Sequence, residues 1–182
     1  MICVISSKGP FASHPPWSSS GSKKVQSLPP LSVTVVDPPQ SSGAPPVLEC
    51  DEVRSYVGRK TTPMWLWIAF APHTRQIVAY ALGDRTEATA RQLWDRLPPS
   101  YREAALYTDD WERYGAVIPG TQHRPCRTSA GRTVHVERWN NSLRQRLARY
   151  TRKTLVFSKS IQTHEACLRL FLHQYNLDRI IL

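Results

Sequence analysis

The chain has 182 residues, with 24 Lys or Arg against 14 Asp or Glu, so its formal net charge is +10 and its pI is about 9.8. The length suits one domain with a tail, and the positive surplus favours nucleic acid as a partner over an anionic membrane. No apolar run approaches the ~20 residues that cross a bilayer, and four scattered cysteines support neither a zinc site nor a disulfide framework. These features predict a cytoplasmic protein with no membrane partner; a generically basic soluble protein is the alternative reading of the charge.

The first 46 residues differ in composition from the rest of the chain. They hold nine of the fifteen prolines and eleven serines, and no strand-like alternation longer than LSVTVV at residues 31–36. This composition predicts a Pro/Ser-rich irregular or disordered arm over residues 1–46, followed by one globular domain over residues 47–182. The arm is either a tail that binds a partner or, more simply, a segment without a fold of its own.

From residue 47 onward the hydrophobic pattern predicts a mixed α/β domain. The predicted elements are strands over 47–57, 65–71 and 76–83, a helix over 85–97, a short strand from 104 to the carboxylates at 109 and 110, and helices over 134–153 and 160–177. The second and third strands should pair as a hairpin, and the last helix should bury Ala166, Leu170 and Leu177. This order matches the ribonuclease-H-like arrangement, in which helices flank a mixed sheet.

Three acidic residues lie where predicted elements begin or end: Asp51 in the first strand, Asp109 at the tip of the fourth, and Glu137 near the start of a helix. In the expected fold the first and fourth strands are neighbours, so the two aspartates should meet and the helix should bring Glu137 over them. Three carboxylates in one cleft repel each other, and Mg²⁺ relieves the repulsion because it prefers oxygen ligands. Two Mg²⁺ ions, or Mn²⁺ in their place, would suit phosphoryl displacement.

Each acid also has an ordinary structural explanation. Asp51 could be a charge that protects a sheet edge from aggregation, Asp109 could begin a turn, and Glu137 could be a first-turn acid favoured by the helix dipole. Neighbouring Glu52 should point to the sheet face opposite to that of Asp51.

The helix that follows Glu137 adds a second signal. Helical spacing places Glu137, Asn140, Asn141 and Arg144 on one face, where Arg144 could meet a phosphate near the metal ions. Between residues 138 and 159 there are seven Lys or Arg and no acid, which predicts a ridge that binds the DNA backbone; a solvated basic face is the alternative. The predicted DNA-binding residues are Arg138, Asn141, Arg146, Arg149, Arg152, Lys153 and Lys159.

A family resemblance is carried by ECDEVRSYVG, TRQIVAYALGDRT, YTDDWERY and HVERWNNSLRQRLARYTRKTLVFSKS. Together these motifs resemble the InsB-type transposases of the insertion-element-one family over about residues 47–175. The resemblance implies a DDE recombinase whose metal-binding acids fall on Asp51, Asp109 and Glu137, with Arg144 as the basic partner. It further implies metal-dependent cleavage at element ends, joining of the 3′-hydroxyl to target DNA, and a homo-oligomeric active complex.

Two departures from the family pattern matter. Family members typically carry a tryptophan where this chain has Arg54. Full-length relatives also resemble a fusion of a zinc-finger and helix-turn-helix region to the catalytic part, and residues 1–46 show neither pattern. The chain therefore resembles a catalytic half, as in a truncated or frame-shifted copy, with a separate zinc-finger/helix-turn-helix subunit as a possible partner. The competing readings are a catalytically silent DNA-binding remnant and a general metal nuclease of the same fold.

Overall fold

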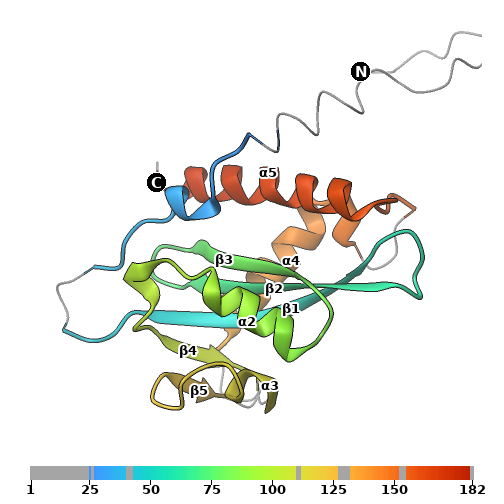
Figure 1. Ribbon diagram of the computed structural model, residues 1–182. Helices are drawn as coiled ribbons and strands as arrows, with labels where there is room; N and C mark the ends of the chain where they lie inside the picture. Colours follow the sequence, from blue (N-terminus) through green and yellow to red (C-terminus); the bar gives the residue numbers. More distant parts are fainter. Residues whose placement is uncertain are drawn as a thin grey trace, which may run out of the picture.

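The computed structural model describes residues 25, 27–39, 43–109, 112–126, 132–151 and 155–180, without the side chains of residues 112 and 113. Its elements are shown in Figure 1. In chain order they are η1 (Leu31–Thr34), β1 (Val47–Tyr56), β2 (Pro63–Ala71), β3 (Gln76–Gly83), α2 (Glu87–Asp95), η3 (Pro99–Tyr101), β4 (Ala105–Thr108), α3 (Glu112–Gly115), β5 (His123–Pro125), α4 (Val134–Arg146), η5 (Ala148–Tyr150) and α5 (Ile161–Ile180).

The strands form one mixed sheet in the order β3-β2-β1-β4-β5. The first three strands are antiparallel neighbours, and β4 and β5 add on the other side of β1 in parallel. This is the ribonuclease-H-like α/β arrangement, as predicted. The predicted hairpin of β2 and β3 and the predicted contact of the first and fourth strands are both confirmed, whereas β5 was not predicted.

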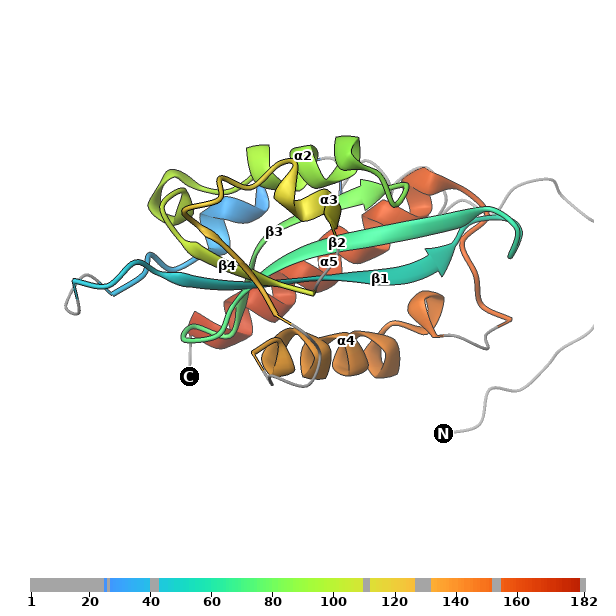
Figure 2. The same cartoon turned by 90° about the horizontal axis from the view of Figure 1, so that it is seen from below.

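Two hydrophobic cores lie on opposite faces of the sheet because successive strand residues point to opposite sides. On β2, Trp67 and Ala69 belong to the core beneath α2 and α3, while Leu66 and Ile68 belong to the core beneath α4 and α5. Figure 2 shows α2 and α3 on one side of the sheet and α4 on the other. Since both faces are covered, β2 reads as a continuous apolar run.

Helix α5 closes the outer edge of β3. Asn176, which is fully buried, accepts a hydrogen bond from the backbone N–H of Ile77 at 2.9 Å and donates one to its carbonyl at 2.9 Å, as a neighbouring strand would. The amide also donates to Thr34 Oγ1 at 2.9 Å, which ties η1 to the domain. Residues 31–34 therefore form a 3₁₀ helix against α5, and not the strand-like alternation seen in the sequence.

The predicted buried face of α5 is wrong. Leu170 and Leu177 are exposed and Ala166 is only half-buried, whereas the buried face includes His164, Leu168 and Asn176. Two of these are polar residues whose burial is compensated by hydrogen bonds, so a count of apolar residues selects the wrong side. Within the described parts of the chain, none of the helices is both long enough and apolar enough to span a membrane.

Helix α4 is shorter than predicted. It ends at Arg146, and Leu147 has an extended backbone with φ −116° and ψ 95°. The hydroxyl of Thr151 donates to the carbonyl of Arg144 at 2.8 Å and so satisfies one of the unpaired carbonyls at the end of the helix. The chain then turns through η5, so Arg149 does not continue the face of α4.

Candidate functional site

The pairing of β1 with β4 brings two remote aspartates to the same place in the sheet. The strands pair from Val47 opposite Ala105 to Glu49 opposite Tyr107, an offset of 58 residues (105 − 47). Asp51 and Asp109 have the same separation (109 − 51 = 58). Asp109 directly follows the last residue of β4, so the pairing of β1 with β4 brings this end of β4 into the neighbourhood of Asp51.

Asp51 is partly buried, and both of its carboxylate oxygens accept hydrogen bonds. The backbone N–H of Glu52 donates to Oδ1 at 2.7 Å, and Asn140 Nδ2 donates to Oδ2 at 2.6 Å. Burial is the main cause that raises the pKa of Asp51 to about 6. The negative charges of Asp109 and Glu137 raise this pKa as well.

Arg144 completes the group that acts on Asp51. Its positive charge opposes the carboxylates and lowers the pKa of Asp51. The side chain is half-buried, seven residues after Glu137 on α4. All four residues predicted to be catalytic thus come close enough to influence one carboxyl group, although they derive from β1, the end of β4 and α4.

Glu49 holds the first turn of α4 against the sheet. This side chain is buried, and it lies two residues before Asp51 on the same strand face. Its Oε2 accepts a hydrogen bond from the backbone N–H of Val136 at 2.8 Å, and its Oε1 accepts one from His135 Nδ1 at 2.7 Å. A carboxylate at the N-terminus of a helix is favoured by the helix dipole. Glu49 therefore helps to hold the first turn of α4 in place on the sheet.

Asn140 is the residue of α4 that touches Asp51 directly. It is only 4% exposed, and its Oδ1 is buried with no hydrogen-bond partner among the described residues. Asn141, predicted to bind DNA, is exposed on the next position of the helix. Glu137, one turn before Asn140, is exposed and accepts a hydrogen bond from Thr133 Oγ1 at 2.9 Å.

Glu52 forms a separate ionic group on the other face of β1, as the strand alternation predicted. Its side chain is 2% exposed and accepts hydrogen bonds from Arg85 Nη2 at 3.0 Å and Nε at 3.2 Å. Burial raises the pKa of Glu52 to about 7, while a hydrogen bond from Tyr114 lowers it. Arg85 Nη2 also lies 3.8 Å from Asp109 Oδ2, so this group places a positive charge beside the second aspartate.

The predicted DNA-binding residues fall into two groups. Arg138 and Arg146 are exposed on α4 and line a small cavity of about 110 Å³ that faces α5. Arg149, in η5, lines a larger cavity on the β1 side together with Arg144. Lys159 is exposed just before α5, and Arg152 and Lys153 lie outside the described residues.

Oxygen donors dominate the group around Asp51. Three carboxylates and the amide of Asn140 supply oxygen atoms, which are the hard ligands that Mg²⁺ prefers. In the described segments, no group of three or more His, Cys, Asp or Glu side chains is gathered closely enough to hold a metal ion. The residues around Asp51 thus offer the type of ligand atom that a hard divalent cation prefers, without being gathered into a metal-binding cluster in the described structure.

Sequence reasoning missed Glu49 and the direct role of Asn140. Strand alternation carried a signal for Glu49, because residues 49 and 51 share a face. Asn140 was placed on the catalytic face by helical spacing, but spacing alone did not separate it from Asn141. Arg85 carried no signal, since only the folded chain brings it from the end of β3 to β1 and β4.

Comparison with known proteins identifies the family of this chain. The family model described as IS1 transposase matches residues 47–177. The chain is 37% identical over 129 residues to the insertion element iso-IS1n protein InsB of Shigella dysenteriae, covering 71% of this chain and 95% of that protein. It is 34% identical over 160 residues to the insertion element IS1 9 protein InsB of Escherichia coli K12, covering 86% and 91%. The chain belongs to the IS1 transposase family.

Proposed function

We propose that this transposase cleaves DNA strands at the ends of its insertion element and joins the freed 3′-hydroxyl to target DNA, in a reaction that depends on divalent metal. Asp51, Asp109 and Glu137 are the proposed metal ligands, and Arg144 is the proposed phosphate contact. The observation that supports the proposal is that Asp109, Glu137 and Arg144 all act on the carboxyl group of Asp51, which the parallel contact of β1 with β4 and the hydrogen bond from α4 bring together.

The environment of Asp51 supports a cation-binding role. A carboxyl group whose pKa is raised by burial and by two neighbouring carboxylates is destabilised in its charged form. A bound cation reverses that effect, because it stabilises all three negative charges at once. When bound, a pair of Mg²⁺ or Mn²⁺ ions would supply an activated attacking oxygen and stabilise the leaving one.

The protein's own residues position this chemistry. Asn140 fixes one oxygen of Asp51 by a 2.6 Å hydrogen bond, and Glu49 anchors the first turn of α4. Arg144 brings a positive charge to the same place from the third turn of α4, where it would hold the scissile phosphate. Each of these groups belongs to a regular element, which supports a preorganised arrangement.

Nicking of DNA tests the proposal. Purified protein should nick a duplex that carries an element end in Mg²⁺ or Mn²⁺, and EDTA should abolish the cleavage. Asp109→Asn should reduce nicking by at least about 10²-fold, because it removes a proposed ligand, while its binding to the same duplex is retained. Asp178→Asn removes an exposed acid on α5 and should cut as the wild type does. Equal cleavage in EDTA, or normal cleavage by Asp109→Asn, would reject the metal site.

A further inference from the structure

A positively charged cavity lies beside the proposed catalytic residues. Its volume is about 450 Å³, within the range of roughly 300–1,000 Å³ that is usual for ligand sites. It is formed by the end of β1, the turn between β1 and β2, and the chain from the end of α4 through η5. The residues that line it include Arg54, Tyr56, Lys60, Arg144, Arg149 and Tyr150.

The lining of this cavity is cationic. Arg54, Lys60, Arg144 and Arg149 all contribute to it, and none of the described lining residues is acidic. Across the described chain, Arg54, Lys60 and Arg149 take part in no salt bridge. Like charges that share a concave surface repel each other and focus the potential there, so the occupant that the cavity favours is an anion with several negative charges.

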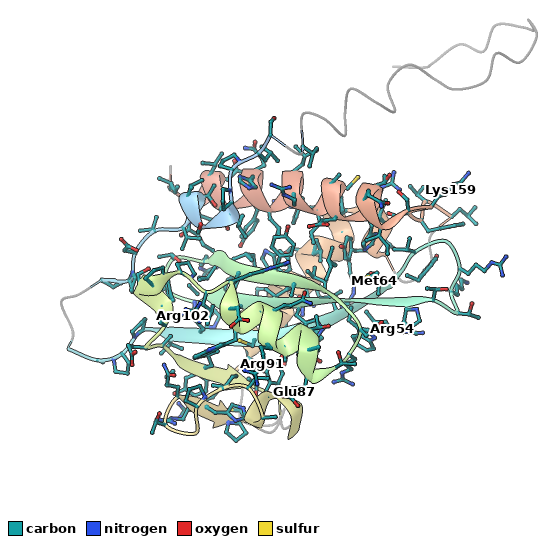
Figure 3. The ribbon with its side chains drawn as sticks, in the orientation of Figure 1. Arg54, Met64, Glu87, Arg91, Arg102 and Lys159 are labelled. Carbon is teal, nitrogen blue, oxygen red and sulfur yellow. The ribbon has the colours of Figure 1, made fainter. Side chains whose placement is uncertain are left out.

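Arg144 connects the cavity to the catalytic group. It lines the cavity, and its charge also acts on Asp51. Arg54 follows Asp51 by three residues on β1, which corresponds to roughly 10 Å along a strand, and Lys60 lies beyond it in the turn. The positive charges thus lead away from the three carboxylates toward the end of the molecule formed by the β1–β2 turn, where Figure 3 shows Arg54.

The walls of the cavity are tied together by one buried histidine. His164 Nε2 lies 3.1 Å from Ser55 Oγ on β1, and its Nδ1 lies 2.9 Å from Ser158 Oγ. The ring of Tyr150 stacks on His164 with 4.6 Å between centroids. The backbone N–H of Gly58 donates to the carbonyl of Ser158 at 2.8 Å. Burial lowers the pKa of His164 to about 4, so the ring stays neutral and rigidly joins three segments.

We propose that this cavity binds the backbone of a single DNA strand beside the scissile phosphate, with Arg54, Lys60 and Arg149 neutralising successive phosphates. The inference rests on the proposed function, because that function places the scissile phosphate at Asp51 and Arg144. A concave site of this volume holds part of one strand, and a duplex does not fit into it. Groups of cations in a groove that tracks the backbone are the usual means of binding single strands.

Salt dependence of binding tests the cavity directly. The probe is a fluorescein-labelled single strand of about 12 thymidines, and anisotropy gives its affinity for the full chain over a range of salt concentrations. Each phosphate contact on a single strand contributes about 0.7 to the slope of log K against log salt. Arg54→Ala and Lys60→Ala should each reduce the slope by about 0.7, and the double variant by about 1.4. Both residues are exposed, so their replacement should leave the thermal midpoint unchanged.

Arg91→Ala is the matched control, since it removes one exposed positive charge from α2, on the other side of the sheet from α4. Its slope should equal that of the wild type. Equal slopes for Arg54→Ala, Lys60→Ala and Arg91→Ala would contradict the proposal that the cavity binds a single strand. A loss of affinity seen only with a blunt duplex would contradict it as well. Nicking is measured on the same preparations. If the slopes change as expected but no Mg²⁺-dependent nicking occurs, only the proposed function is rejected. If nicking occurs but the slopes do not change, only the proposed binding of a single strand in the cavity is rejected.

Discussion

Asp51 combines two properties that oppose each other in a protein without a cation. It is partly buried next to other carboxylates, which disfavours its charge, and it accepts short hydrogen bonds from Glu52 and Asn140, which favour it. The net effect raises its pKa to about 6. A group of this kind lowers the stability of the fold at neutral pH, and it is retained where its charge serves binding or catalysis.

Asp51→Asn should therefore stabilise the metal-free protein at neutral pH. The pKa of Asp51 is higher in the folded than in the unfolded chain, so the folded state binds the proton more tightly. The free energy of unfolding then falls as the pH rises from about 4 through about 6. The variant lacks this loss. The free energy of unfolding of the variant should exceed that of the wild type by on the order of 1–2 kcal/mol at pH 7.5, and the difference should be nearly absent at pH 4.

Urea denaturation without divalent metal, at pH 4 and pH 7.5, gives this difference. The comparison of variant with wild type cancels the titration of His164, whose pKa is also altered. The charge of Asp51 raises the pKa of Glu52 as well, so the difference includes this coupled contribution, which has the same sign. A difference between the two proteins that does not change with pH would show that Asp51 is not destabilised by its charge.

At the scale of elements, α4 packs on the sheet through Val136, Trp139 and Leu143, and one buried carboxylate of β1 holds its first turn. Glu49 accepts hydrogen bonds from the backbone of Val136 and from the ring of His135 while it is 3% exposed. Glu49, which takes no part in the proposed chemistry, therefore helps to position Glu137, Asn140 and Arg144 over β1.

Glu49→Ala should destabilise the fold by about 1–3 kcal/mol, since it leaves the buried backbone N–H of Val136 without its hydrogen-bond acceptor. Glu103→Ala removes an exposed acid and should change the free energy of unfolding by less than about 0.5 kcal/mol. Urea denaturation at pH 7 compares the two variants with the wild type. If Glu49→Ala loses no more stability than Glu103→Ala, the capping contact does not anchor the helix.

The strands were predictable and the last helix was only partly so. In β2, apolar residues on both faces of the sheet identify a central strand. In α5 the hydrophobic pattern selected Leu170 and Leu177, which are exposed, because the buried face uses hydrogen-bonded His164 and Asn176. Pattern reasoning reads hydropathy and does not detect a polar side chain whose partners come from distant strands.

At the scale of the whole molecule, the candidate site is formed by residues that are far apart in the sequence. Asp51, Asp109 and Glu137 come from three elements, and the parallel contact of β1 with β4 is what unites the first two. The sequence predicted this contact through the order of elements and the family resemblance. It could not predict Arg85 beside Asp109 or the cavity around Arg54, because both depend on the packing of segments that are far apart in the chain.

Binding of Mn²⁺, followed by electron paramagnetic resonance of the free ion, tests most directly whether the three acids form one metal site. The wild type should bind Mn²⁺ saturably, with competition by Mg²⁺. Asp51→Asn and Asp109→Asn should each weaken that binding by about tenfold or more, while Asp178→Asn on the surface of α5 should leave it unchanged. Equal Mn²⁺ binding by the wild type and Asp109→Asn would contradict a metal site shared between β1 and β4.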